Sequence, residues 1–309
     1  MLVNDFIAKR KNIPMLEISD LEKTTAKKQL MASVNLILHE SEILAVVGEH
    51  QSGKSLLSKL ILTLSRKTKG TIKVSGDQFL GAFIPREQFL PKATVNTIIK
   101  DYCKLNNRVC VRSKVKNILT LLNLREQLHT RYGDLSNSEK DRLKIALPLI
   151  ARTDILILDA PFTNLMPDEA KDLRVILKKI ATELKTAIII TARKMAEIEE
   201  FCDTIAIIDD GVIVAIQSYN KMIAREFDQA KLAVTVAQPN YAAKVIETEF
   251  KVPVKLCGDQ VIINLKPERV QMVVDKLIEK HITVLGANRV YRSLEHQYWE
   301  IIKNRKNYY

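Results

Sequence analysis

The chain has 309 residues, of which 47% are apolar and 27% are charged, a balance typical of a globular protein. Its formal net charge of +12 points to anionic partners such as nucleotides, nucleic acid or lipid headgroups. No apolar run is long enough to cross a bilayer, no secretory signal is expected at the start, and the four cysteines have neither metal nor disulfide spacing.

Strands and helices alternate along the first two thirds of the chain. After an irregular extension over residues 1–14, we expect an α/β domain over residues 15–228, with a helical subdomain at about 87–150. The apolar run ILAVV, residues 43–47, is typical of a strand covered on both faces. The alternation predicts a largely parallel sheet. Further strands are predicted at 15–19, 34–38, 71–75, 81–85, 154–158, 187–191, 204–208 and 212–215, and helices at 56–65, 94–124, 138–151, from 167 and at 194–201.

The composition changes near Asp228, and residues 229–309 are predicted to form a separate accessory domain. Its elements follow the order βαββαβ, which is the ferredoxin-like arrangement, with a hairpin turn at Gly258–Asp259. A last helix follows, with Ser293 as its N-cap. His281 and His296 are expected to be surface or packing residues, and we find no catalytic constellation in this part.

A phosphate-binding loop is predicted where the strand 43–47 meets the following helix. The sequence GEHQSGKS fits the pattern G-x-x-x-x-G-K-[ST], in which backbone N–H groups and the helix N-terminus bind phosphate. Lys54 is expected to reach the β- and γ-phosphates of ATP, and the Ser55 hydroxyl to ligate Mg²⁺. The predicted phosphate-binding residues are Gly48, Glu49, His50, Gln51, Ser52, Gly53, Lys54 and Ser55.

A second part of the site is predicted at the end of the strand ILILD. Asp159 ends this buried strand, and with a phosphate loop upstream it is expected to hold Mg²⁺ through the water shell of the ion. The residue that follows is Ala160, where such a site would want a second carboxylate.

The order of these motifs resembles the ATP-binding subunit of ABC transporters. The resemblance rests on the phosphate loop, the segment DLSNSEKDR at 134–142, the ILILD strand and the strand-end segment TAR, and it covers about residues 15–225. The later segment SLEHQYWEII is similar to the end of some bacterial subunits linked to drug or peptide-antibiotic export. The resemblance implies an ABC-type P-loop NTPase fold, with ATP and Mg²⁺ as cofactors.

The resemblance also implies partners. In the family, two ATP-binding domains hold two ATP molecules head to tail, each between one chain's phosphate loop and the other chain's signature segment. We therefore expect a second ATP-binding subunit and separate transmembrane permease chains, with this chain in the cytoplasm at the inner face of the membrane. The basic segment 86–116 is expected to face the permease, the headgroups or solvent, with Arg86, Lys92, Lys100 and Lys104 as candidates.

Several positions depart from the family pattern. The family's catalytic glutamate falls on Ala160, and its switch histidine on Arg193, or on Ala192 if the register slips by one. The signature segment, Leu135, Ser136, Asn137, Ser138 and Glu139, has lost its two glycines and gained an acid. The family's glutamine falls on Arg86, with Gln88 two residues on. The aspartate that follows the ATP-site strand in the family falls on Met166. Residues 19–30, around Thr24 and Thr25, contain no aromatic residue that could stack on adenine.

These departures predict a subunit that binds Mg-ATP but hydrolyses it poorly or not at all. A heterodimer with an intact partner is favoured over a homodimer, because a homodimer would carry both defects in both sites. Two other functions stay open: an ATP-responsive regulator without hydrolysis, and a soluble ABC-type protein acting on nucleic acid. The second alternative is disfavoured by the single ATP domain and the lack of heptads, so no stable nucleic-acid binding is expected.

Overall fold

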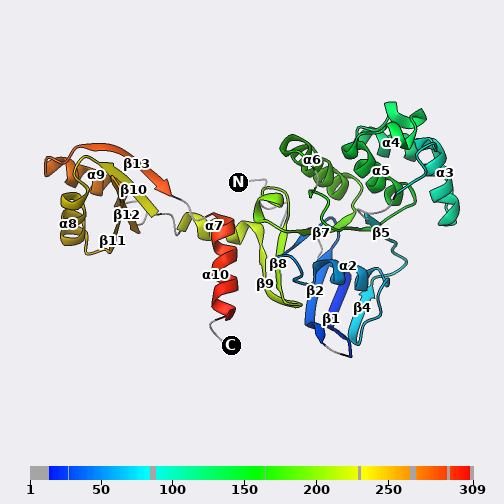
Figure 1. Cartoon of the computed structure of the whole chain (residues 1–309), viewed down its shortest axis with the longest axis horizontal. Coiled ribbons are helices and arrows are strands. Elements are labelled where there is room, and N and C mark those ends of the chain that lie inside the picture. Colours follow the sequence, from blue (N-terminus) through cyan, green and yellow to red (C-terminus); the bar gives the residue numbers. More distant parts are fainter. Residues whose placement is uncertain are drawn as a thin grey trace. The chain divides into compact units, whose positions relative to one another are not determined.

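The computed structural model describes residues 14–26, 28–83, 88–163, 165–228, 231–264, 269–290 and 293–306. The chain divides into two compact units, Met1–Ser218 and Tyr219–Tyr309 (Figure 1). The predicted extension over residues 1–14 lies outside the described residues except for Pro14, which begins the first strand. Within the described ranges, no helix combines the length and apolarity that crossing a bilayer requires.

A six-stranded sheet forms the centre of the first unit. Its order is β5 (Leu80–Phe83), β6 (Ile155–Leu158), β7 (Ala187–Ala192), β3 (Ile43–Val47), β8 (Thr204–Asp209) and β9 (Val212–Ser218). The pairs are parallel except for β8 with β9, which form a hairpin. Every residue of β3, β6 and β7 is buried, as their continuous apolar sequences predict for strands covered on both faces.

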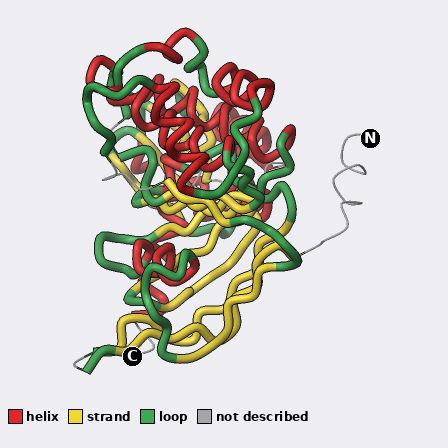
Figure 2. Tube along the Cα trace, turned by 90° about the vertical axis from the view of Figure 1, so that its right-hand side faces the viewer, coloured by secondary structure: helices red, strands yellow, loops and turns green. Residues whose placement is uncertain are grey.

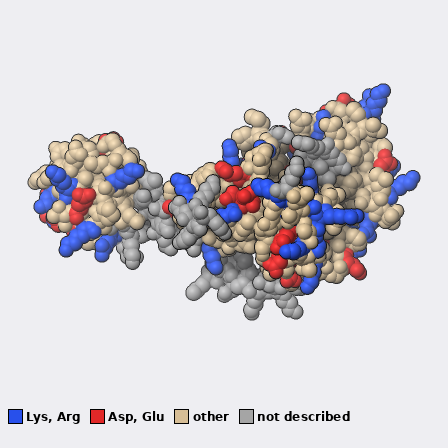
Figure 3. Space-filling model, turned by 60° about the horizontal axis from the view of Figure 1, so that its bottom comes forward, with Lys and Arg blue, Asp and Glu red and all other residues tan. Residues whose placement is uncertain are grey.

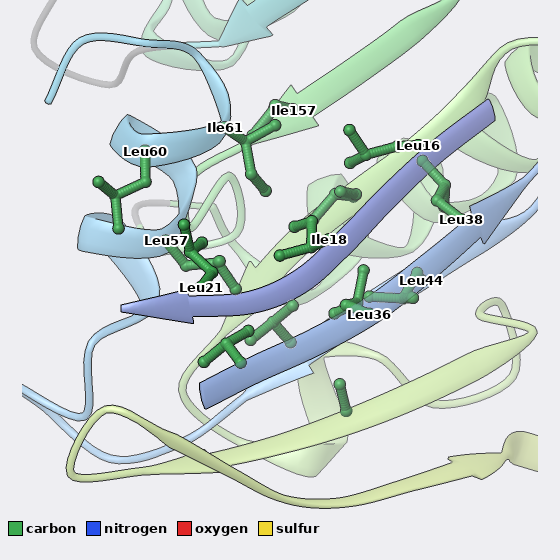
Figure 4. Packing of buried hydrophobic residues seen from close by; sticks show 14 of the residues in the cluster. Leu16, Ile18, Leu21, Leu36, Leu38, Leu44, Leu57, Leu60, Ile61 and Ile157 are labelled. Atoms are coloured by element: carbon green, nitrogen blue, oxygen red, sulfur yellow. The ribbon is translucent and has the colours of Figure 1, made fainter. Parts of the chain in front are cut away.

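A smaller antiparallel sheet covers one face of the six-stranded sheet. It has the order β2 (Gln29–His39), β1 (Pro14–Thr24), β4 (Lys69–Val74). Helix α2 (Lys54–Ile61) lies between the two sheets (Figure 2). Its side chains Leu57, Leu60 and Ile61 pack against residues of both sheets, including Leu21 and Ile157 (Figure 4). This burial fixes the start of α2, and with it the phosphate-binding loop.

Helices gather on the other side of the six-stranded sheet (Figure 2). They include α3 (Val95–Leu105), α4 (Arg112–Leu121), α5 (Asn137–Ile150) and α6 (Pro167–Glu183), with short 3₁₀ turns η1 (Glu126–His129) and η2 (Tyr132–Asp134) before α5. Pro167 stands in the first turn of α6, where its missing N–H costs nothing.

The prediction of a helix at 194–201 is wrong. Only a 3₁₀ turn, η3 (Met195–Glu197), forms there. The Glu197 carboxylate accepts a hydrogen bond from the Arg193 backbone N–H at 3.0 Å, which closes the turn at its start. Glu200 then adopts a left-handed conformation with φ 63°, which a continuing helix does not allow.

The second unit has the βαββαβ order that its sequence predicts. The elements are β10 (Lys231–Val236), α8 (Pro239–Phe250), β11 (Val254–Cys257), β12 (Gln260–Asn264), α9 (Val270–Glu279) and β13 (Val284–Val290). The strands form an antiparallel sheet in the order β11-β12-β10-β13. Val234, Ile246, Val261 and Leu277 are fully buried in its core.

Two further helices complete this unit. α7 (Tyr219–Asp228) precedes β10, so the unit begins about ten residues before the predicted boundary at 228/229. The reason is that α7 pairs with α10 (Leu294–Lys306): the buried Gln297 side chain donates to the Met222 carbonyl at 3.0 Å. The Ser293 hydroxyl accepts from the His296 backbone N–H at 3.2 Å, as the predicted N-cap requires.

Candidate nucleotide site

The loop between β3 and α2 has a backbone that only its two glycines allow. A Cβ atom on Gly48 would lie 2.2 Å from the Ile208 carbonyl oxygen, a distance that no side chain tolerates. Gly53 has φ 105°, a conformation that L-residues with side chains rarely adopt. α2 begins at the next residue, so the loop delivers its N–H groups and the positive end of a helix to one place.

The Lys54 side chain folds back along this loop. Its ammonium donates to the carbonyl oxygens of Gly48 and Glu49, both at 2.6 Å, and to the Ser52 hydroxyl at 3.1 Å. Burial, and then the nearby Arg193 guanidinium, lower the pKa of Lys54 from 10.5 to about 8. Burial disfavours the charged form of this side chain, and a bound anion beside it would favour the charged ammonium again.

Asp159 lies beside the loop and is held by two hydroxyl groups. Its Oδ1 accepts from the Thr191 hydroxyl at 2.7 Å and from the Ser55 hydroxyl at 3.2 Å. Thr191 comes from β7, which lies between β6 and β3 in the sheet. The same Thr191 oxygen accepts from the Ala160 backbone N–H at 2.9 Å. Ala160 has φ 49°, a left-handed conformation that is uncommon for alanine.

A cavity of about 440 Å³ opens above these residues. It brings together residues 50–55 of the predicted phosphate loop, Asp159, Ala160 and Arg193, whereas Gly48 and Glu49 are not among its described lining residues. All of the lining residues come from the first unit. Thr191, Leu30 and Leu56 were not predicted from the sequence; the only signal for Thr191 was its place at the carboxyl end of an apolar strand. The lining residues are Leu30, His50, Gln51, Ser52, Gly53, Lys54, Ser55, Leu56, Asp159, Ala160, Thr191 and Arg193.

The residues present fit Mg²⁺. The Ser55 hydroxyl and the Asp159 carboxylate are hard oxygen donors and lie 3.2 Å apart at the N-terminal end of α2. Within the described ranges there is no cluster of three or more His, Cys, Asp or Glu side chains that would form a metal cage. A site of this kind suits an ion held mainly by water and by the phosphates of a nucleotide.

The signature segment lies outside this cavity. Ser136 and Glu139 form a capping box at the start of α5: the Ser136 N–H donates to the Glu139 carboxylate at 2.8 Å, and the Glu139 N–H donates to the Ser136 hydroxyl at 3.2 Å. The Ser138 hydroxyl is buried and accepts from Arg142 at 2.9 Å. The Glu139 charge is therefore directed to its own helix terminus within this chain.

The remaining predicted positions are also outside the cavity. Gln88 lines a separate space with Phe89, Tyr132 and Asn137, and Met166 is the exposed residue before α6. The Thr25 hydroxyl donates to the Lys28 carbonyl at 2.9 Å and closes a turn between β1 and β2. No aromatic residue lines the cavity among those the structure describes. Arg86 lies outside the described residues.

A parallel sheet with a phosphate loop after one strand and an aspartate after another defines a P-loop NTPase. Residues 31–163 match the family model for ABC transporters. The chain is 24% identical over 296 residues to the Bacillus subtilis ABC transporter ATP-binding protein YdbJ, covering 92% of this chain and 94% of that protein. It is 26% identical over 251 residues to the bacitracin transport ATP-binding protein BcrA of Enterococcus faecalis, covering 76% and 79%.

Solved structures show the same fold. One of them is cbiO1 from Clostridium perfringens, part of the ABC transporter complex cbiONQ, with a TM-score of 0.61, 20% identity, and coverage of 68% of this chain and 91% of that one. The chain belongs to the ATP-binding subunits of ABC transporters.

Proposed function

We propose that this subunit binds Mg-ATP at the loop after β3 and retains it, with little or no hydrolysis of its own. The observation that carries the proposal is the arrangement at the end of β6. Asp159 is fixed beside Ser55 and Lys54, whereas the next side chain toward the cavity is the methyl group of Ala160.

Binding is supported by the chemistry of the loop. Backbone N–H groups, the buried Lys54 ammonium and the end of α2 supply positive charge for the phosphates. Ser55 and Asp159 would hold Mg²⁺, which supplies charge neutralisation at the phosphates when it is bound. Arg193 adds a second cation to the same cavity.

Poor hydrolysis is supported by what the cavity lacks among its described lining residues. A water molecule that attacks the γ-phosphate needs a group that orients it and accepts its proton, and losing such a group costs about 10²–10⁴-fold in rate. The Ala160 methyl can do neither. Asp159 is the only carboxylate in the lining, and both of its hydrogen bonds described above hold it toward Ser55 and Thr191.

The same proposal assigns partners. The chain would act with transmembrane permease chains and with a second ATP-binding subunit, peripherally at the inner face of the membrane. A heterodimer in which the partner carries an intact glutamate is favoured, because the signature segment Ser136–Glu139 departs from the family as well. The Enterococcus faecalis relative is named for bacitracin transport, and together with the segment SLEHQYWEII this supports an export-type transporter.

Equilibrium binding tests the nucleotide part of the proposal. We expect the purified chain to bind ATP in the presence of Mg²⁺, and the Lys54→Ala variant to lose that binding. Lys59→Ala is a matched control, because Lys59 lies on the exposed side of the same helix. Equal affinity in the Lys54→Ala variant and the wild type would contradict the proposal.

A further inference from the structure

A second and larger cavity lies in the helical part of the first unit. It has a volume of about 910 Å³, which is in the range of sites that hold small molecules. Its walls come from α3, from α4 and from the segment around η1. The lining residues are Asn96, Lys100, Cys110, Arg112, Val115, Lys116, Leu119, Arg125, Glu126, Leu128 and His129.

The charged side chains that line this cavity are mostly basic. Each wall brings a basic side chain: Lys100 from α3, Arg112 and Lys116 from α4, and Arg125 and His129 from the third wall. Glu126 is the only acid among the described lining residues. Among the residues that the structure describes, none of these basic side chains forms an ion pair. The described lining therefore holds five basic side chains against the single carboxylate of Glu126.

The start of α4 adds to the positive electrostatic potential in the cavity. Its N-cap residue Val111 makes no side-chain cap, and no acid stands in its first turn. Instead Arg112 and Lys116 occupy positions near the positive end of the helix, where cations are unfavourable. Unpaired N–H groups and like charges at one end of a ten-residue helix are stabilised when an anion binds there. Lys and Arg side chains also stand out along the edge of this unit in Figure 3.

We propose that this basic cavity binds a multiply phosphorylated small molecule or headgroup. A single phosphate would leave most of the volume and most of the cations unused, whereas two or more phosphate groups would meet cations on all three walls. The nucleotide loop is built differently, from glycine backbone and one buried lysine, and no residue lines both cavities. The inference does not depend on whether the nucleotide site hydrolyses ATP.

Cys110 gives a reporter inside the cavity. It is half-buried in the lining, whereas Cys103 and Cys202 are buried and Cys257 is exposed on β11. In the full-length Cys257→Ser variant, we expect tripolyphosphate to slow alkylation of Cys110, measured by mass spectrometry of the labelled peptide. The protection should persist when Lys54→Ala removes tripolyphosphate binding at the nucleotide loop.

A charge-neutral variant of the cavity tests the assignment. Replacing Lys100, Arg112 and Lys116 together by Gln should weaken the protection at least about tenfold in tripolyphosphate concentration. A control with Lys171, Lys179 and Lys185 replaced by Gln loses the same charge on an exposed face and should behave as the parent. Circular dichroism checks that both variants are folded. Absence of protection in the parent, or equal protection in the cavity variant, would overturn the proposal.

The same assay separates the two sources of such a ligand. Protection of Cys110 by phosphatidylcholine vesicles that contain cardiolipin, whose headgroup carries two phosphates, and not by phosphatidylcholine alone, would assign the cavity to lipid headgroups. Protection by tripolyphosphate without any effect of these vesicles would assign it to a soluble polyphosphate. If the cavity variant loses co-purification with a membrane protein and Cys110 is never protected, the cavity is a protein contact and the proposal fails.

Discussion

Thr191 connects the two residues that distinguish this site, because its hydroxyl donates to Asp159 Oδ1 at 2.7 Å and accepts from the Ala160 N–H at 2.9 Å. The hydroxyl is buried, and Thr191 is 1% exposed. It holds the magnesium aspartate in place and fixes the backbone of the alanine in its left-handed conformation.

We expect Thr191→Val to destabilise the protein by about 1–3 kcal/mol, since it leaves the partly buried Ala160 N–H without its acceptor. It should also weaken Mg-ATP binding, because Asp159 loses one of its two hydroxyl partners. Urea unfolding and ATP titration measure the two effects. Thr182→Val on the exposed face of α6 is the control, and an equal result for both variants would contradict this role of Thr191.

Gly48→Ala should abolish ATP binding by displacing the loop. Its Cβ would lie 2.2 Å from the Ile208 carbonyl oxygen, so either the loop or β8 has to move. Gly286→Ala is the matched control, because a Cβ there meets no atom within 4 Å. Normal ATP affinity of the Gly48→Ala protein would show that the close approach of the loop to β8 is not needed for binding.

The affinity for ATP should fall as the pH rises above about 8. The pKa of Lys54 is lowered to about 8, chiefly by burial, and a bound phosphate would raise it again because it favours the charged form. Binding therefore takes up a proton above pH 8, and the affinity should decrease about tenfold per pH unit until the pKa of the bound state is reached. Below about pH 8 the ammonium is already charged in the free protein, so the lysine contributes no pH dependence to the affinity there.

A calorimetric titration at several pH values measures this effect. Lys54→Arg keeps its charge throughout the range and should remove the dependence. A wild-type affinity that stays constant between about pH 7.5 and 9.5 would contradict the lowered pKa of Lys54.

Ser136→Ala should cost about 1 kcal/mol of stability by removing the N-cap of α5. The hydroxyl accepts from the Glu139 N–H, and the Glu139 carboxylate accepts from the Ser136 N–H. Glu139→Gln keeps the acceptor oxygen and should cost less. Thermal unfolding of the two variants gives the comparison, and equal losses of stability would contradict the prediction by showing that the charge of Glu139 matters as much as the Ser136 cap.

The sequence was sufficient for the parts of the site that are local. The phosphate loop and Asp159 each follow a strand whose apolar run is unmistakable, so their chemistry could be predicted from neighbours in the chain. Thr191 could not be assigned in this way, because its role depends on β7 lying between β6 and β3 in the sheet. The basic cavity likewise needs three segments packed together, although the excess of Lys and Arg was visible.

The segment Ser136–Glu139 shows the opposite case. Its pattern S-x-x-E is the signal for a capping box, and the structure forms that box. Sequence comparison with the family drew attention to the charge of Glu139 near a phosphate, whereas local helix chemistry accounts for where the carboxylate points.

Replacing Ala160 tests how many parts of hydrolysis are missing. Ala160→Glu alone should restore little turnover in the purified chain, because the segment Asn137–Glu139 also departs from the family. Adding Asn137→Gly, Ser138→Gly and Glu139→Gln should raise turnover further. Ala160→Gln has the same shape and backbone strain as the glutamate variant without the carboxylate, and should stay inactive. Full activity from Ala160→Glu alone would refute the two-defect account.

The most direct test of the central claim is a single-turnover measurement on the wild-type chain with radiolabelled ATP and Mg²⁺. We predict that the bound nucleotide is recovered as ATP and leaves the protein without cleavage, and that Lys54→Ala retains none. Release of phosphate by the wild-type chain at a rate of about 10 s⁻¹, which is ordinary for enzymes, would contradict the account.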